Sequence, residues 1–140
     1  MGIANQLSKF GSSDIATEMF LVHSRAWPWD DWMWMLERSP IYHAGKSKTP
    51  LLIMHGEKDP RVHPSQSLEM YRNLKLRGQA PVRLVLYPDE KHGNRKAAAR
   101  FDYSQRMMRW MNHYLKGPGG SPPEWQLDYS KRLEDDEEID

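Results

Sequence analysis

The sequence predicts an α/β domain with a small parallel sheet flanked by helices, and two observations lead to this prediction. Residues 51–55 and 82–87 are short strand-like runs, and Pro50 precedes the first while Pro88 follows the second. A helical pattern lies between the two runs and another follows the second. Because a strand–helix–strand crossover is right-handed and joins parallel strands, the two strands should lie side by side and point the same way.

The amino-terminal region is predicted to be helical. Residues 1–22 have the spacing of two short helical pieces, broken at residues 11–14, where Ser13 or Asp14 would cap the second piece. Further along, residues 27–36 contain four of the six tryptophans and read as a helix that is apolar on every side. Such a helix is usually buried on several sides. An interface or the wall of a substrate cleft is the alternative, because large aromatic side chains are enriched there.

The remaining elements are predicted to alternate between strand and helix. Pro40 ends the tryptophan-rich helix and leaves residues 40–48 as a connection to the first strand. Helices are predicted over residues 64–76 and about 96–115, with Gly78 as the cap of the first. The apolar face of the first helix consists of Leu68, Tyr71 and Leu74, and that of the second of Phe101, Met108, Met111 and Leu115, with Trp110 and Tyr114 beside it. Residues 119–140, rich in proline and then acidic, are expected to form a mobile tail.

Composition excludes several classes of function. The 140 residues fit one domain, and the absence of cysteine excludes disulfides, thiolate metal sites and a cysteine nucleophile. None of the six histidines forms a metal-binding pair at helical spacing, so no metal or other cofactor is expected. The formal charge is +1, with six of the 19 acidic residues in residues 134–140, and no basic stripe interleaved with aromatics indicates nucleic acid. The chain shows no apolar run of membrane-spanning length and no secretory signal, so a cytoplasmic location is expected.

Two polar residues follow the ends of the predicted strands. Asp59 comes shortly after the first strand and His92 shortly after the second, so parallel strands would place both at one edge of the sheet. An acid that accepts the Nδ1–H of a histidine is the orienting half of a catalytic triad, and it leaves Nε2 free to take a proton. Gly93 would let the loop aim the ring. A solvated Asp and a solvated His would give the same spacing, so position alone leaves both interpretations open.

The motifs around these residues resemble a known family. The segment Leu51-Leu52-Ile53-Met54-His55-Gly56-Glu57-Lys58-Asp59 with Val62, and the segment Tyr87-Pro88-Asp89-Glu90-Lys91-His92-Gly93, resemble the carboxyl-terminal part of prolyl oligopeptidase family hydrolases. These serine peptidases, which include dipeptidyl and acylaminoacyl peptidases, have the α/β-hydrolase fold. The resemblance implies that residues 1–118 form the carboxyl-terminal portion of such a domain. It also implies that Asp59 is the triad acid and His92 the general base.

The sequence departs from the family pattern because the motif that carries the nucleophile is missing. The triad order in this fold is Ser, Asp, His, and none of the eleven serines lies in a Gly-x-Ser-x-Gly elbow. The expected function is therefore a peptidase or esterase that carries two triad residues, with weak activity on activated esters. Its nucleophile would be a local serine, a serine of a partner chain, or a water activated by His92. A catalytically inactive remnant or interaction module is the alternative, and a fragment of an active parent is a third interpretation.

Other residues near the expected site receive simpler interpretations. Glu90 is an alternative acid, but the resemblance places the acid at Asp59. His55 is expected to support the turn, and Arg61 to be solvated; Ser65 and Ser67 are expected to cap the following helix. The first strand would lack a neighbour on one side, and an open strand edge is a template for pairing. We therefore expect a homo-oligomer through that edge, through the tryptophan-rich segment, or through both.

Overall fold

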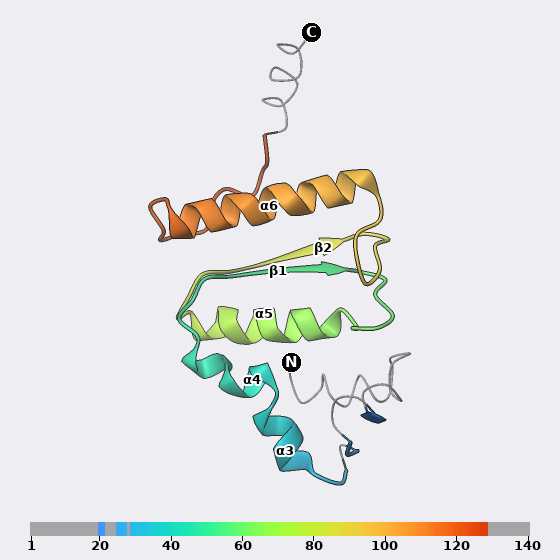
Figure 1. Ribbon diagram of the computed structural model, residues 1–140. Coiled ribbons are helices and arrows are strands. Elements are labelled where there is room, and N and C mark those ends of the chain that lie inside the picture. The colour runs from blue at the N-terminus through green and yellow to red at the C-terminus, as the bar shows by residue number, and fades with distance from the viewer. Residues whose placement is uncertain (1–19, 22–24, 28, 129–140) are drawn as a thin grey trace.

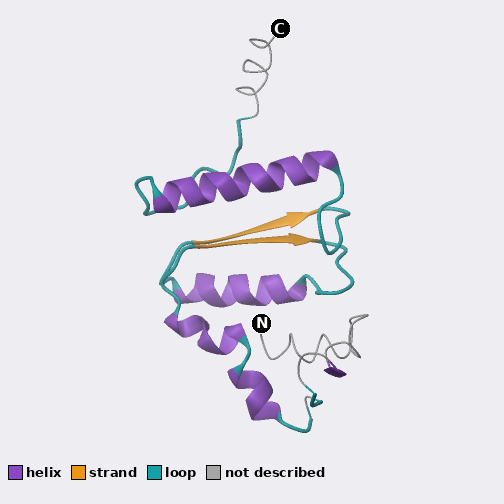
Figure 2. Cartoon of the chain, in the orientation of Figure 1, coloured by secondary structure: helices purple, strands orange, loops and turns teal. Residues whose placement is uncertain are grey.

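The computed structural model describes residues 20–21, 25–27 and 29–128, which form layers around a two-stranded sheet. Strand β1 (Leu51–Gly56) pairs in parallel with β2 (Val82–Tyr87), with Leu51 opposite Val82 and Gly56 opposite Tyr87. Helix α5 (Ser65–Arg77) covers one face of the sheet and α6 (Ala97–Leu115) covers the other (Figures 1 and 2). The predicted small parallel sheet flanked by helices is confirmed.

Local signals set the ends of the central elements. The backbone N–H of Leu51 donates to Pro81 O at 3.0 Å, and that of Glu57 donates to Tyr87 O at 3.0 Å, so the ladder spans all of β1. Helix α5 ends where Gly78 adopts a left-handed conformation with φ of 60°. The N–H of Gly78 donates to Leu74 O at 3.1 Å, as the predicted glycine cap requires.

The core lies between the sheet and α5 and includes part of the preceding connection. Its buried centre is Ala44, Leu74 and Val82, with partly buried side chains packed around them. Ala44 belongs to a segment expected to be a plain connection, and that expectation was wrong. The segment holds helix α4 (Pro40–His43) and the short 3₁₀ helix η2 (Ala44–Lys46). Pro40 opens α4 because the first turn of a helix does not need its missing N–H.

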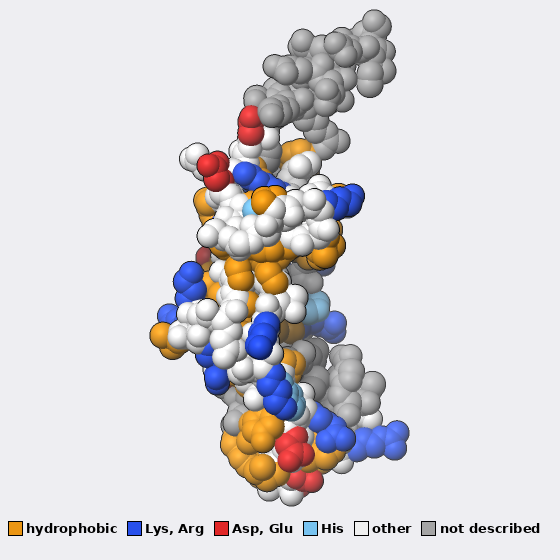
Figure 3. All heavy atoms as spheres, turned by 90° about the vertical axis from the view of Figure 1, so that its left-hand side faces the viewer, with side chains coloured by type: hydrophobic (Ala, Val, Ile, Leu, Met, Phe, Trp, Pro, Cys, Tyr) orange, Lys and Arg blue, Asp and Glu red, His pale blue; other side chains and the backbone are white. Residues whose placement is uncertain are grey.

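The tryptophan-rich segment is shorter and more exposed than predicted. Helix α3 spans Trp32–Glu37, and its start is set by Asp31, whose side chain accepts the N–H of Trp34 at 2.9 Å. Met35 is the buried residue of α3, whereas Trp32 and Met33 are exposed and Trp29 is 73% exposed. Hydrophobic side chains gather at this end of the molecule (Figure 3). The prediction of burial on several sides was therefore wrong, because α3 lies at the end of the layers and not between them (Figure 1).

Most of the apolar face predicted for helix α6 is exposed and not buried. Trp110 is buried, while Met108, Met111 and Leu115 are exposed. The reason lies in the residues after the helix, which run back along it. Carbonyls of this segment accept hydrogen bonds from three arginines: Arg83 binds Pro123 O, Arg106 binds Trp125 O at 2.9 Å, and Arg109 binds Gln126 O at 2.5 Å.

The described part of the predicted tail, residues 119–128, contacts α6 and β2 through these arginines, and its mobility stays a prediction. We call this segment the strap. The rest of the predicted tail, residues 129–140, lies outside the described residues, as do the helical pieces expected in residues 1–22 except for residues 20–21. Within the described part of the chain, no helix is both long enough and apolar enough to cross a membrane.

Candidate active site

Asp59 lies in the turn that follows β1, and backbone groups orient its carboxylate. The N–H of Asp59 donates to Gly56 O at 3.2 Å, which closes the turn. Its Oδ1 accepts the backbone N–H groups of Arg61 at 2.8 Å and of Val62 at 2.9 Å. An Asp side chain that binds the backbone two residues ahead is a common turn-forming arrangement. Oδ1 is thus occupied by the turn, and Oδ2 is left to face other elements.

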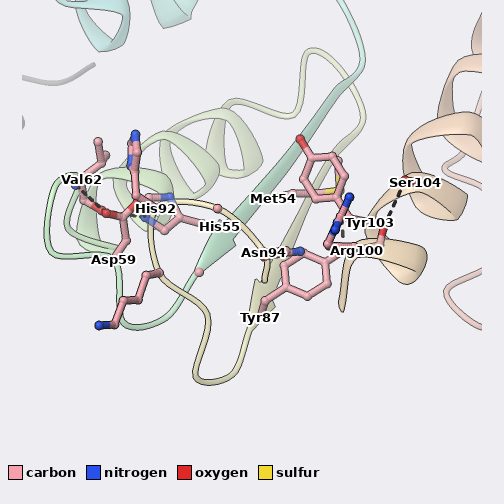
Figure 4. Close-up of a pocket in the computed structure, with 13 residues that line it drawn as sticks. Met54, His55, Asp59, Val62, Tyr87, His92, Asn94, Arg100, Tyr103 and Ser104 are labelled. Carbon is pink, nitrogen blue, oxygen red and sulfur yellow. Dashed lines mark hydrogen bonds and ion pairs between the residues drawn. The ribbon is translucent and has the colours of Figure 1, made fainter. Parts of the chain in front are cut away.

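His92 comes from the loop after β2 and meets Asp59, as the sequence predicted. Its Nδ1 lies 2.9 Å from Asp59 Oδ2. Since a carboxylate only accepts, Nδ1 carries the proton and Nε2 is the basic nitrogen. The side chain of His92 is 52% exposed and that of Asp59 is buried, so solvent reaches the base but hardly the acid. Figure 4 shows the two side chains together at one end of a pocket.

The environment of Asp59 keeps its carboxyl ionised. Burial acts to raise its pKa, since a charged group is poorly solvated inside a protein. The hydrogen bonds from the Val62 N–H, from His92 and from the Arg61 N–H act in the opposite direction. Together they outweigh burial, and the pKa of Asp59 lies below its ordinary value of 3.8. The group is therefore an anion at neutral pH, as an acid that orients a histidine must be.

Close backbone contact holds the His92 loop against the end of β1. The N–H of Lys58 donates to Glu90 O at 2.9 Å. At Gly56 a Cβ atom would lie 2.3 Å from Lys91 O and 2.5 Å from Glu90 O, so only glycine fits. At Gly93, by contrast, an added Cβ would meet nothing within 4 Å. The glycine that this site requires is therefore Gly56, and the space at Gly93 does not demand one.

Glu90, the alternative acid, has a different set of contacts. Its side chain accepts the backbone N–H groups of Arg95 at 2.7 Å and of Lys96 at 3.1 Å, just before α6 begins. The residue is 2% exposed. The bond from Arg95 is the largest influence on the carboxyl and, with that from Lys96, lowers its pKa despite the opposing effect of burial. Glu90 thus binds the start of α6, and Asp59 is the acid that contacts His92.

Two predictions about supporting residues have different outcomes. His55 binds Val62 O through Nε2 at 2.7 Å, which agrees with the predicted role in supporting the turn. Ser67 was expected to cap α5, but its hydroxyl instead lies 2.7 Å from Nδ1 of His55. Ser65 likewise binds a ring, that of His63, at 2.9 Å. The capping prediction was wrong because histidine nitrogens compete for these hydroxyls.

The cavity beside His92 extends from the turn to the first half of α6. It has a volume of about 480 Å³, and its lining includes Asp59, His92, Arg100, Tyr103 and Ser104. Figure 4 shows Arg100, Tyr103 and Ser104 at the end opposite the Asp59–His92 pair. The hydroxyl of Ser104 donates to Arg100 O at 3.1 Å. Among the described residues, then, no serine hydroxyl contacts Nε2 of His92.

A partly buried network beside this cavity was not found from the sequence. The Tyr87 hydroxyl donates to Asp102 Oδ2 at 2.9 Å, and Arg106 Nε donates to the same oxygen at 2.8 Å. Burial and then the bond to Asp102 raise the pKa of Tyr87, which keeps the phenol protonated. The Asp102–Arg106 spacing of four residues on a helix was an available signal. The network fixes α6 to the end of β2 and so supports one wall of the cavity.

Comparison with known proteins identifies the family. Residues 2–118 match the prolyl oligopeptidase family. The chain belongs to this family. It is 35% identical to the acylamino-acid-releasing enzyme of Homo sapiens over 121 residues, which are 81% of this chain and 16% of that protein. It is 43% identical to dipeptidyl aminopeptidase BIII of Pseudoxanthomonas mexicana over 60 residues, which are 43% of this chain and 9% of that protein.

Solved structures agree with the family assignment and set its extent. The acylaminoacyl peptidase of Pyrococcus horikoshii has a TM-score of 0.71 and 26% identity, covering 94% of this chain and 21% of that one. A puromycin-hydrolyzing peptidase of Mycobacterium tuberculosis has a TM-score of 0.72 and 25% identity, covering 88% of this chain and 19% of that one. The structure is therefore part of an α/β-hydrolase fold, and the chain spans about a fifth of these relatives or less.

Proposed function

We propose that this chain supplies the acid and the general base of a peptidase or esterase of the serine-hydrolase type. The observation that carries the proposal is the 2.9 Å contact between Nδ1 of His92 and Oδ2 of Asp59. The His92 ring also borders an open cavity. In this arrangement Asp59 fixes the tautomer and stabilises the imidazolium. Nε2 takes a proton from the nucleophile and later gives it to the leaving group.

The proposed substrates are peptides or esters. The relatives are named as acylamino-acid-releasing and dipeptidyl peptidases, which favours a peptide. A nucleophile is still needed, and its proposed sources are a serine of this chain, a serine of a partner chain, or a water activated by His92. Because the sequence has no Gly-x-Ser-x-Gly elbow, we expect the chain of 140 residues to act weakly, on activated esters. Its proposed location is the cytoplasm.

Hydrolysis of a nitrophenyl ester by the purified chain tests this proposal. General acid–base catalysis contributes roughly 10²–10⁴-fold, so His92→Ala and Asp59→Ala should lower the rate above background by about 10²-fold. His63→Ala is the matched control, because His63 lies in the same loop as Asp59 but binds Ser65 at the start of α5, and it has no contact with Asp59 among the described residues. If His92→Ala and the wild type hydrolyse the ester at equal rates, Asp59 and His92 take no part in the reaction.

A second experiment identifies the nucleophile. A serine-directed phosphonate should label the chain if one of its own serines attacks the substrate, and peptide mass spectrometry would then locate that serine. Absence of label together with a rate that depends on His92 would favour an activated water. Label that appears only on an added protein would favour a nucleophile from a partner chain.

A non-catalytic, self-associating module is the second candidate function, and specific surfaces favour it. The sheet of the described chain has two strands, so the edge of β1 away from β2 has no neighbouring strand among those residues. Exposed apolar side chains lie at the end of the molecule formed by α3. For this candidate, ester hydrolysis would be absent or independent of His92, and association would remain.

A further inference from the structure

A largely buried histidine that takes no part in the proposed proton transfer lies next to the Asp59–His92 pair. His55 is the penultimate residue of β1, and its side chain is 9% exposed. Both ring nitrogens are engaged: Nδ1 lies 2.7 Å from the hydroxyl of Ser67, and Nε2 lies 2.7 Å from Val62 O. The ring therefore connects the end of β1 to the start of α5 and to the turn that holds Asp59.

The identity of the partners determines the tautomer of His55. A carbonyl oxygen only accepts hydrogen bonds, so Nε2 must carry a proton and donate it to Val62 O. In the neutral ring Nδ1 is then the acceptor, and the Ser67 hydroxyl donates to it. Nε2 is also 3.5 Å from Asp59 Oδ2, so the same N–H lies beside the carboxylate oxygen that binds His92.

Val62 is the point through which His55 acts on Asp59. Its carbonyl accepts the bond from His55, while its N–H donates to Asp59 Oδ1 at 2.9 Å. Fixing the Val62 carbonyl restricts rotation of the chain in this turn, including the N–H groups that hold Oδ1. With Oδ1 held, Oδ2 has one direction left, which is toward His55 and His92.

We propose that His55 is a positioning residue that fixes the Asp59 carboxylate for its bond to His92. Ser67 assists by holding Nδ1, which keeps the Nε2–H directed at the turn. The meaning of this contact for catalysis rests on the proposed function, but the geometry itself is testable without activity. The test is the tautomer of each histidine, which long-range nitrogen–proton NMR spectra of the rings report directly.

The experiment uses the full chain at a pH where both rings are neutral. In the wild type His55 should be the Nε2–H tautomer and His92 the Nδ1–H tautomer. His55→Leu removes both ring contacts, so His92 should shift toward the Nε2–H tautomer that free histidine prefers. His55→Gln can place an amide N–H near the position of Nε2, so it should retain most of the His92 signal. His63→Gln is the matched control and should change neither tautomer.

Each result either supports or overturns the proposal. A folded His55→Leu variant that keeps His92 in the Nδ1–H form would overturn it, as would a wild-type His55 in the Nδ1–H form. If His55→Leu does not fold, Ser67→Ala replaces it, and an unchanged His92 tautomer there counts against the proposal. In the ester assay, His55→Leu should lower kcat about tenfold with KM little changed. Expected tautomers with a rate independent of His92 would reject the proposed function and leave the positioning role intact.

Discussion

At the scale of single residues, the relative placement of Asp59 and His92 depends on backbone packing at Gly56. The carbonyls of Glu90 and Lys91 lie where a Cβ of residue 56 would be, which brings the His92 loop against the end of β1. Because these neighbours are backbone atoms, they cannot move aside as a flexible side chain would. The distance between acid and base is thus set by a residue that touches neither of them through a side chain.

Gly56→Ala should therefore destabilise the chain and displace the His92 loop. The added methyl would lie 2.3 Å from Lys91 O, and overpacking of this kind costs roughly 1–3 kcal/mol. The free energy of unfolding in urea measures the loss. Gly93→Ala is the matched control, since its Cβ meets nothing within 4 Å, and it should change stability by less than about 0.5 kcal/mol. Equal stability of the two variants would contradict this account.

Two carboxylates with lowered pKa values predict how stability depends on pH. Asp59 and Glu90 have folded-state pKa values below the ordinary 3.8 and 4.5. Near these values the unfolded state binds more protons, so the stability they contribute is present above the ordinary pKa and is lost as pH falls through the folded one. Glu90→Gln should be less stable than the wild type at neutral pH, and the difference should shrink on acidification below about pH 4.

Urea unfolding at several pH values between neutrality and about pH 3 measures this difference. Glu57→Gln is a matched control, because Glu57 is exposed and the bonds to Arg95 and Lys96 come from Glu90 instead. A Glu90→Gln variant whose deficit stays constant with pH would show that the carboxylate charge is not the source of the stability.

At the scale of elements, local signals predicted the boundaries of the main strands and helices. Helix α5 was expected over 64–76 and spans Ser65–Arg77; α6 was expected over about 96–115 and spans Ala97–Leu115. Proline, glycine and hydrophobic period act over a few residues, so they are visible in the sequence. Helix α4 and η2 were missed because packing of Ala44 against Leu74 and Val82, and not a local pattern, places them.

The buried side of α6 was missed for a related reason. The hydrophobic pattern assigns the apolar stripe to the interior. Arg106 and Arg109, however, donate hydrogen bonds to strap carbonyls that lie 19 and 17 residues further along the chain. A carbonyl carries no signal in the amino-acid sequence. The Asp59–His92 contact, in contrast, followed from strand order and family resemblance, whereas the His55–Ser67 bond is specified by neither.

The strap should contribute measurably to stability through Trp125. Its ring lies 5.4 Å from the guanidinium of Arg83 and 4.7 Å from that of Arg106. An exposed cation–π contact is worth roughly 0.5–1 kcal/mol, so Trp125→Ala should lower the free energy of unfolding by about 1 kcal/mol. Leu76→Ala, at an exposed position on α5, is the control and should have little effect. The strap contributes nothing if the two variants unfold at the same urea concentration.

At the scale of the whole molecule, three apolar or unpaired surfaces stand out among the described residues. They are the outer edge of β1, the α3 end with Trp29 and Trp32, and the methionine side of α6. The part of the relatives that this chain matches is only about a fifth of their length or less. Association through these surfaces stays a prediction, and the edge of β1 would offer the most specific contact because it pairs backbone groups.

A pair of proline variants tests association through this edge. The N–H groups of Leu51 and Glu57 bond to Pro81 and Tyr87 on the β2 side, so alternation along β1 directs the N–H of Ile53 to β2 and that of Leu52 outward. Proline is tolerated where a strand N–H faces away from its sheet. Leu52→Pro should therefore keep the circular dichroism of the wild type and lower its light-scattering mass toward 16.5 kDa. Ile53→Pro removes a ladder bond and should lose the fold.

A wild-type mass of 16.5 kDa at micromolar concentration would refute association, and an unchanged oligomer in Leu52→Pro would move the interface away from β1.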